Sequence, residues 1–137
     1  MLILLIVIDP SSGSVSLAME EVRERIIIRE AIEDHRASSE NNPRSDYGKI
    51  ISSADRSTDA DEFLRRTHAY TLRYFPDCSE AEAVSRAYEH TAQKYGKTGY
   101  AKHYVKDEEY ERFREYINLL LDDKGFFEKK YREINNL

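Results

Sequence analysis

Residues 79–96 read SEAEAVSRAYEHTAQKYG, and this stretch carries the signals for both ends of a helix. Ser79 followed three residues later by Glu82 forms a capping box, in which each side chain binds the backbone N–H of the other residue. Gly96 directly after Tyr95 is typical of the residue that ends a helix. The stretch therefore predicts a helix that begins after Ser79 and ends at Tyr95.

Helical patterns continue on both sides of this stretch. Toward the N-terminus, a helix that begins near residues 59–61 ends at Phe75, because the residue before Pro76 avoids the helical conformation. Toward the C-terminus, Asp107 is placed to cap another helix, and a short last helix follows an interruption at Lys124-Gly125. The apolar stripes of these two helices are Tyr110, Phe113, Ile117 and Leu120 or Leu121, and then Phe126, Phe127, Tyr131 and Ile134.

Two further helices are expected in the first half of the chain. One begins at Leu17, with Ser16 as its N-cap, and runs to about Ala37. A short one runs from about Ser45 to Asp55, beyond a polar break that contains Pro43. The residues expected to face inward are Val22, Ile28, Ile32 and His35 on the first, with Ile26 and Ile27 beside them, and Tyr47, Ile51 and Ala54 on the second.

Isolated helices of these lengths are only marginally stable in water, so they must pack on one another. With 137 residues, the chain has room for one ordinary domain. We therefore expect an all-α bundle of five to six helices that forms a single domain over residues 17–137.

Residues 1–16 differ from the rest of the chain. Met1–Ile8 reads MLILLIVI, an unbroken apolar run, and residues 9–16 have the composition of a turn or linker. Eight residues are too few to cross a bilayer as a helix, which takes about 20. A secretory signal does not fit either, because no Lys or Arg precedes the run. The run is either a docked apolar element or a segment that owes its sequence to a displaced start.

The composition excludes several classes of protein. The formal net charge is −5, from 21 Lys and Arg against 26 Asp and Glu, which argues against a protein that coats nucleic acid. The single cysteine excludes a disulfide framework and a multi-cysteine metal cluster. We expect a cytoplasmic protein with no membrane partner, whose function has to be sought in its motifs.

His35 and Asp55 are the first candidates for chemistry. His35 extends the stripe of Ile28 and Ile32, and Asp55 follows Ile51 by one helical turn, so both are expected near the buried side. An imidazole and a carboxylate on consecutive helices can bind one divalent metal ion, and the pair suits Mn, Fe, Zn or Ni better than Ca. The simpler alternative is a core histidine that is hydrogen-bonded to an aspartate.

These two residues lie in motifs that are similar to those of a known family. Residues 32–35 read IEDH and residues 53–56 read SADR. They resemble two motifs of the HD-superfamily metal-dependent phosphohydrolases, in which one helix ends in Ile-x-x-His and the following helix ends in Ala-Asp. The resemblance implies that His35 and Asp55 bind a divalent metal ion (Mn, Fe, Zn, Ni or Mg), and that Lys49 and Arg56 contact a phosphate. It covers residues 17–56 as the HD-like part, and residues 57–137 look like the helical C-terminal extension of stand-alone members.

The upstream half of the family's pattern is absent from this chain. The family takes its name from an adjacent His-Asp pair, which follows another metal-binding histidine. This chain has no His-Asp dipeptide and no histidine before His35. Because a catalytic metal usually has at least three protein ligands, a complete site would need His68, Glu62 or a residue of another subunit. We expect the chain by itself to be inactive.

Residues 94–106 read KYGKTGYAKHYVK, and this segment reverses the sign of the overall charge, with four lysines and no acid. Lysines interleaved with tyrosines can bind phosphates and stack on bases. Lys97 and Lys102 are therefore candidates for binding a phosphorylated substrate, and weak binding of nucleic acid is a lesser hypothesis. The alternative is a connector whose tyrosines pack on the bundle while its lysines stay in water.

The sequence thus leads to two hypotheses of function. The first is an HD-superfamily hydrolase-like protein, a remnant of that domain, which would act on a phosphorylated small molecule or a nucleotide. The second is a non-catalytic helical module that self-associates, for example as a homodimer, or binds another partner. The second hypothesis rests on the missing metal ligands and on the apolar run at Met1–Ile8.

Overall fold

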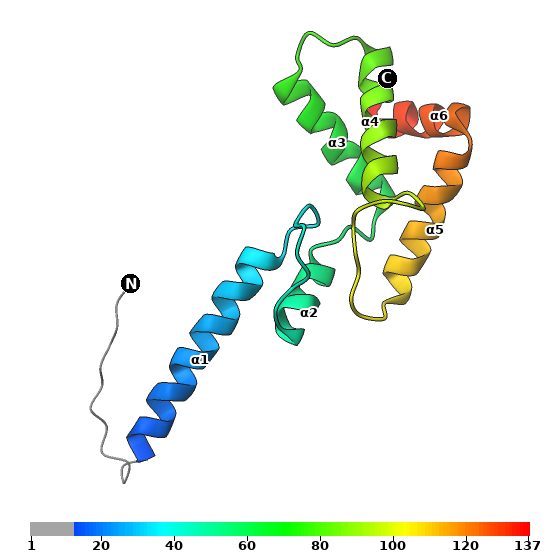
Figure 1. Cartoon of the computed structure of the whole chain (residues 1–137). Coiled ribbons are helices and arrows are strands. Elements are labelled where there is room, and N and C mark those ends of the chain that lie inside the picture. Colours follow the sequence, from blue (N-terminus) through cyan, green and yellow to red (C-terminus); the bar gives the residue numbers. More distant parts are fainter. Residues whose placement is uncertain (1–12) are drawn as a thin grey trace.

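The computed structural model describes residues 13–137, so the apolar run at Met1–Ile8 lies outside the described residues. The described chain is built of six helices (Figure 1). Their bounds are α1 Gly13–Asp34, α2 Asp46–Ala54, α3 Ala60–Tyr74, α4 Glu80–Tyr95, α5 Glu108–Asp122 and α6 Lys124–Asn135. No strand occurs between residues 13 and 137, which confirms the expected all-α fold of five to six helices. None of these six helices is long and apolar enough to cross a membrane.

The helix ends follow the capping signals of the sequence. The Ser79 N–H donates to Glu82 Oε2 at 2.8 Å, and the Glu82 N–H donates to Ser79 Oγ at 3.2 Å, which is the predicted capping box. Asp59 and Asp107 accept backbone N–H groups at the starts of α3 and α5. Gly96 ends α4 with φ −60°, and glycine is needed there for space, since a Cβ would lie 2.3 Å from a carbonyl oxygen of α4.

Helices α3 to α6 pack together and enclose the hydrophobic core (Figure 1). The Tyr95 ring lies edge-on to Phe63, with 5.2 Å between centroids, and to Phe113, with 4.9 Å. Phe127 is edge-on to Tyr88 at 5.2 Å. Edge-to-face contacts of this kind add to the stabilisation that comes from burying the rings. The core also contains Leu64, Val84, Ala87, Tyr110, Ile117, Leu120 and Tyr131.

Helices α1 and α2 pack on each other and extend from the bundle, with α2 beside the C-terminal part of α1 (Figure 1). Gly48 faces this contact: a Cβ at this position would lie 3.7 Å from the Cα of Ala31 of α1, an ordinary contact, and 3.2 Å from both Pro43 and Ser45 just before α2, where space is tight. The buried side of α2 is therefore made of small residues. It consists of Gly48, Ser52 and Ser53, and not of the predicted Tyr47, Ile51 and Ala54.

Arg44 holds the loop between α1 and α2 through charged hydrogen bonds. Its Nε and Nη2 each donate to the Asp34 carboxylate at 3.0 Å, and its Nη2 also donates to Glu33 at 2.6 Å. The Arg44 guanidinium and backbone N–H favour the charged form of Asp34 and hold the pKa of this carboxyl below its usual range. The same contacts turn the chain, so α1 ends at Asp34 and not at the predicted Ala37.

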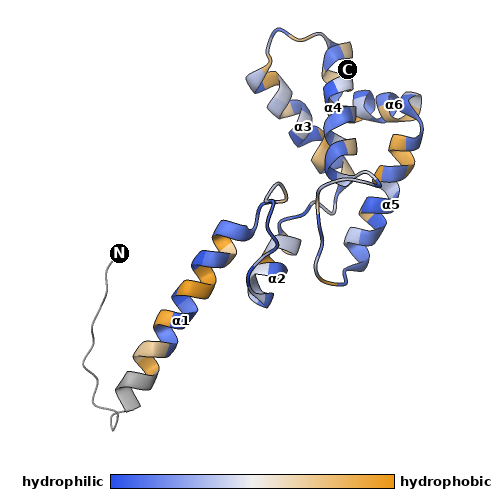
Figure 2. Ribbon diagram, viewed as in Figure 1, coloured by the Kyte–Doolittle hydropathy of each residue, from blue (hydrophilic) through white to orange (hydrophobic). Residues whose placement is uncertain are grey.

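The inward stripe predicted for the first helix is wrong for most of its length. Val22, Ile28 and Ile32 are exposed, and Ile32 has 62 % of its surface open to water. The reason is that α2 has only nine residues and covers the part of α1 around buried Ala31. No other helix in residues 13–137 packs on α1. Figure 2 shows hydrophobic residues spread along α1 where it extends from the bundle.

Two predicted boundaries also differ from the structure. The first helix begins at Gly13, so Ser16 lies inside it and is not its N-cap. Lys124 and Gly125 do not interrupt the helices but belong to the first turn of α6. Asp123 alone separates α5 from α6, and its side chain caps α6 by accepting a backbone N–H at 3.1 Å.

Candidate functional site

The two HD-like motifs meet where helices α1 and α2 join the bundle. Arg56, directly after Asp55, lies in this seam with 2 % of its side chain exposed. Its Nη1 donates to the His35 carbonyl oxygen at 3.1 Å, and its Nη2 donates to Ser52 Oγ at 2.8 Å. Its Nε donates to the Lys102 carbonyl oxygen at 3.0 Å. Arg56 therefore connects the end of α1, α2 and the segment between α4 and α5.

His35 and Asp55 both present atoms that can bind a divalent metal ion. The His35 Nδ1 lies 2.5 Å from the Ile32 carbonyl oxygen. A carbonyl oxygen only accepts hydrogen bonds, so Nδ1 carries the proton and Nε2 of the neutral ring keeps its lone pair. Metal-binding histidines commonly have this arrangement. Asp55 follows α2 with 51 % of its side chain exposed, and its carboxylate lies 3.7 Å from the Arg56 guanidinium.

The described residues contain no closed set of metal ligands. Among residues 13–137, no three His, Cys, Asp or Glu side chains lie together in a way that could hold a metal ion. His68, which was a candidate to complete the site, lies where α3 meets α6, and its Nδ1 is 2.7 Å from the Tyr131 hydroxyl. Glu62 is exposed in the first turn of α3. Asp55 lines a groove between α3 and α4, and His35 is not among the residues that line this groove.

The residues predicted to bind a phosphorylated substrate lie in three places. Lys49 is on α2, with its Nζ 3.4 Å from an aspartate of the same helix. Lys97 is exposed beyond α4, with its Nζ 3.6 Å from an aspartate at the end of α5. Arg56 and Lys102 do meet, through the hydrogen bond to the Lys102 carbonyl, and the Lys102 Nζ donates to Asn42 at 3.1 Å.

The segment of residues 94–106 packs against the rest of the chain with part of its aromatic surface. Tyr95 is buried in the core, and its hydroxyl accepts the Ser57 N–H at 3.0 Å. Tyr104 is half-buried, and its N–H donates to Ser53 Oγ at 2.8 Å. Tyr100 is exposed. The segment thus helps to hold α1 and α2 on the bundle.

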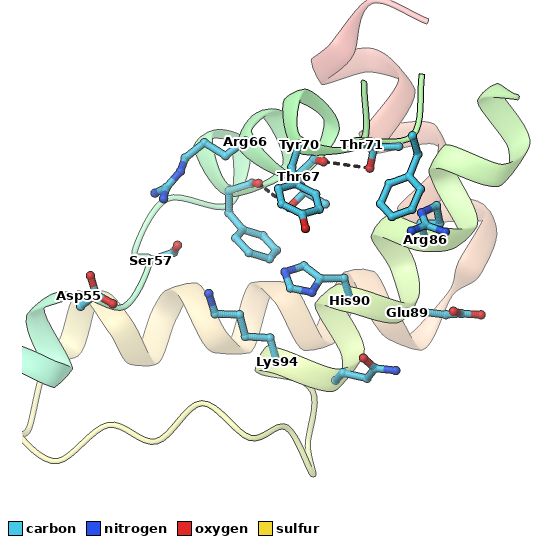
Figure 3. A pocket seen from close by; sticks show the side chains of 13 residues that line it. Asp55, Ser57, Arg66, Thr67, Tyr70, Thr71, Arg86, Glu89, His90 and Lys94 are labelled. Atoms are coloured by element: carbon cyan, nitrogen blue, oxygen red, sulfur yellow. Dashed lines mark hydrogen bonds between the residues drawn. The ribbon is translucent and has the colours of Figure 1, made fainter. Parts of the chain in front are cut away.

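A groove with a volume of about 730 Å³ runs between α3 and α4. Figure 3 shows Tyr70 of α3 and His90 and Lys94 of α4 directed into the space between the two helices. The buried Phe63 ring is stacked on the His90 ring with 6.0 Å between centroids. The groove therefore brings aromatic and cationic side chains of two helices together.

The sequence carries only a weak signal for this groove. Its residues recur every three or four positions, as any helix face does; they include Phe63, Arg66, Thr67 and Tyr70 on α3, and Arg86, His90 and Lys94 on α4. From the sequence, Arg65 and Arg66 look like an ordinary surface pair. Only the packing of α3 beside α4 makes these two rows the walls of one groove.

His90 is expected to titrate below the ordinary histidine value. Burial lowers the pKa of His90, and the positive charge of Lys94 lowers it further. The folded protein should therefore lose stability as the pH falls through about 6.5, because the unfolded chain takes up the proton first. NMR titration of the ring C–H signals measures this pKa. Lys94→Gln should raise the pKa of His90 part of the way toward the ordinary histidine value, because it removes one of the two causes. Lys97→Gln, outside the groove, should leave this pKa unchanged. A His90 pKa at or above 6.5 would contradict the prediction.

Comparisons with models of known protein families, with curated proteins and with solved structures found no match. Function therefore has to be inferred from the residues and their geometry.

Proposed function

We propose that residues 17–56 are part of a metal-dependent phosphohydrolase site of the HD type, in which His35 and Asp55 are two of the ligands. The observation that carries this proposal is the hydrogen bond from Arg56 to the His35 carbonyl oxygen at 3.1 Å. It brings the end of one motif beside the end of the other, although 21 positions separate the two residues. This proximity of the two motifs supports the proposal that His35 and Asp55 bind one ion.

The donor set suits a divalent ion. One imidazole and one carboxylate favour Mn, Fe, Zn or Ni, and Mg is a further candidate. When bound, such an ion would polarise a phosphate and activate a water molecule. The chain's own contribution is to orient the ligands, since the Ile32 carbonyl fixes the proton of His35 on Nδ1 and Arg56 holds the backbone next to Asp55.

The proposal needs ligands beyond these two. A catalytic metal usually has three protein ligands, and residues 13–137 hold no group of three. The remaining ligands would come from a second chain or from a segment outside the described residues. The substrate would be a phosphoester or a nucleotide, as the resemblance implies, and we expect no hydrolysis by residues 13–137 alone.

Metal binding tests this proposal. The full chain is analysed for metal content after purification and is then titrated with Mn²⁺ by calorimetry. We expect saturable binding that is lost in His35→Ala and in Asp55→Ala. Asp46→Ala is the matched control, because it removes an exposed carboxylate from the other end of α2. This variant should bind Mn²⁺ as the parent chain does. No bound metal in the parent chain, or unchanged binding in the first two variants, would overturn the proposal.

The surface of α1 favours a second function, a non-catalytic helical module that associates with a second copy of itself. Its exposed large apolar side chains are Leu17, Met19, Val22, Ile26, Ile28 and Ile32. Exposed apolar side chains that gather on one element mark a surface for another protein chain. Acidic residues and arginines are interspersed along α1, so a second copy of this helix can place opposite charges beside each other.

The oligomeric state tests this second function. Met19, Val22 and Ile26 recur at spacings of three and four, so they share one side of α1. Sedimentation velocity should show a dimer that Val22→Lys together with Ile26→Lys converts to a monomer. Leu119→Lys, on the exposed surface of α5, should leave the dimer intact. A chain that is monomeric from micromolar to millimolar concentration would rule out self-association.

A further inference from the structure

The groove between α3 and α4 has the size and lining of a binding site for a small organic molecule. Its volume is about 730 Å³, within the range of roughly 300–1,000 Å³ that is usual for ligand pockets. Such pockets have apolar and aromatic walls with a few charged groups that orient the ligand. Both kinds of group are present here, and they come from both helices.

The aromatic part of the groove suits a planar ring. The Phe63 and His90 rings stack with 21° between their planes. Tyr70 lies on α3, as Phe63 does, and is directed toward His90 of α4 (Figure 3). Tyr70 is exposed, and its ring lies 4.5 Å from that of Tyr74, measured between centroids. Burial and the positive charge of Lys94 lower the pKa of His90, which favours the uncharged ring. A flat ligand between Tyr70 and His90 would therefore meet an aromatic surface on each side.

The cations of the groove are available to an anion. Arg66 and Lys94 lie at the end nearest Asp55 (Figure 3). The Lys94 Nζ is 5.8 Å from the centroid of the Phe63 ring, so its charge is beside the aromatic part. Among the described residues, neither Arg66 nor Lys94 forms an ion pair. A charge-assisted bond to an anionic ligand would satisfy both.

The other charged residues of the lining are already engaged or directed away. Arg86 covers the Phe75 ring, with 3.4 Å between its guanidinium carbon and the ring centroid. Asp55 lies near the Arg56 guanidinium. Glu89 points away from the groove (Figure 3). One end of the groove therefore has a local excess of positive charge, although the whole chain is acidic.

We propose that this groove binds a small planar aromatic molecule that carries one anionic group, a carboxylate or a phosphate. The ring lies between Tyr70 and His90, and the anion binds Arg66 and Lys94. The inference concerns the extension that follows the HD-like part and does not depend on whether His35 and Asp55 bind a metal.

Calorimetric titration of the full chain with matched probes tests the ligand class. The probes are 2-naphthoate and 1-naphthyl phosphate, which combine a flat ring with a carboxylate or a phosphate. 2-Naphthol lacks the anion, and cyclohexanecarboxylate lacks the flat ring. We expect at least one naphthyl anion to bind at least about tenfold more tightly than either of these two compounds. The tighter of the two naphthyl anions identifies the anionic group.

Variants with matched controls locate the binding in the groove. Arg66→Gln and Lys94→Gln should each weaken it by about tenfold, because each removes one charged hydrogen-bond donor. Arg65→Gln makes the same change at the neighbouring exposed position and should have no effect. Tyr70→Ala should weaken binding by about fivefold or more through lost stacking. Leu72→Ala, also exposed on α3, should not.

Two results would overturn the inference. One is the absence of saturable binding of both naphthyl anions up to millimolar concentration. The other is binding that Arg66→Gln and Lys94→Gln leave unchanged, since the probes would then bind elsewhere, for example on the apolar surface of α1. Circular dichroism of each variant shows that a loss of binding does not come from unfolding.

Discussion

Replacing Phe127 by alanine is expected to lower the free energy of unfolding by about 3–5 kcal/mol. The Phe127 ring is fully buried, edge-on to Tyr88 and parallel to Tyr131. The substitution removes its apolar surface from the core and leaves a cavity that close-packed helices cannot fill. Because small domains are stable by only about 5–15 kcal/mol, the loss would be a large part of the total.

Phe126 provides the matched control for this substitution. It precedes Phe127 on α6 but has 43 % of its surface exposed. Phe126→Ala should therefore cost about 1 kcal/mol or less. Urea denaturation followed by circular dichroism compares the two variants, and equal losses would contradict the orientation of α6 described above.

Replacing Arg56 by alanine is expected to cost about 3 kcal/mol or more. The buried guanidinium donates to the carbonyl oxygens of His35 and Lys102 and to Ser52 Oγ. Without it, the Lys102 carbonyl and Ser52 Oγ lose this donor, and the His35 carbonyl keeps only the hydrogen bond from Ser52 Oγ at 3.2 Å. The seam connects α1 and α2 to the bundle. The amide hydrogens of α2 should therefore exchange with solvent faster in the variant than in the parent protein.

Two further variants separate the role of this seam from the effect of charge. Arg65→Ala removes an exposed arginine from α3 and should change the stability by about 0.5 kcal/mol or less. Arg56→Lys keeps the charge but lacks the planar set of donors, so it should restore only part of the stability. If Arg56→Ala had the same free energy of unfolding as the parent protein, the hydrogen bonds of Arg56 would not be what holds the seam.

The helices of the bundle were predictable because their signals are local. Ser79 with Glu82, Asp107, and Pro76 after Phe75 act on backbone groups within three or four residues. The apolar stripe of Tyr110, Phe113, Ile117 and Leu120 is also buried as predicted. The errors came where a neighbour decides the outcome, as in α2, where close approach to α1 buries Gly48 and Ser52 in place of Tyr47 and Ile51.

The candidate site was predictable only in part. His35 and Asp55 were found through two short motifs, and their role as metal ligands stays a prediction. Lys102 and Arg56 were proposed to bind a substrate, and the structure places them in a hydrogen bond that no spacing rule indicates. The groove residues Arg66, Tyr70 and His90 carry no motif, because a row of residues on one helix does not reveal what lies opposite.

The sequence by itself determined that the fold of residues 17–137 is all-α and where most of its helices begin and end, because capping and turn preferences depend on neighbours along the chain. Only the tertiary structure decided which faces are covered. The apolar residues of α1 show that a partner surface is favourable, but a nine-residue α2 leaves Leu17, Met19 and Val22 exposed. Likewise, the pairing of α3 with α4 turned two unremarkable helix faces into a groove. Contacts between distant segments depend on how helices pack, and this information is spread over the whole chain.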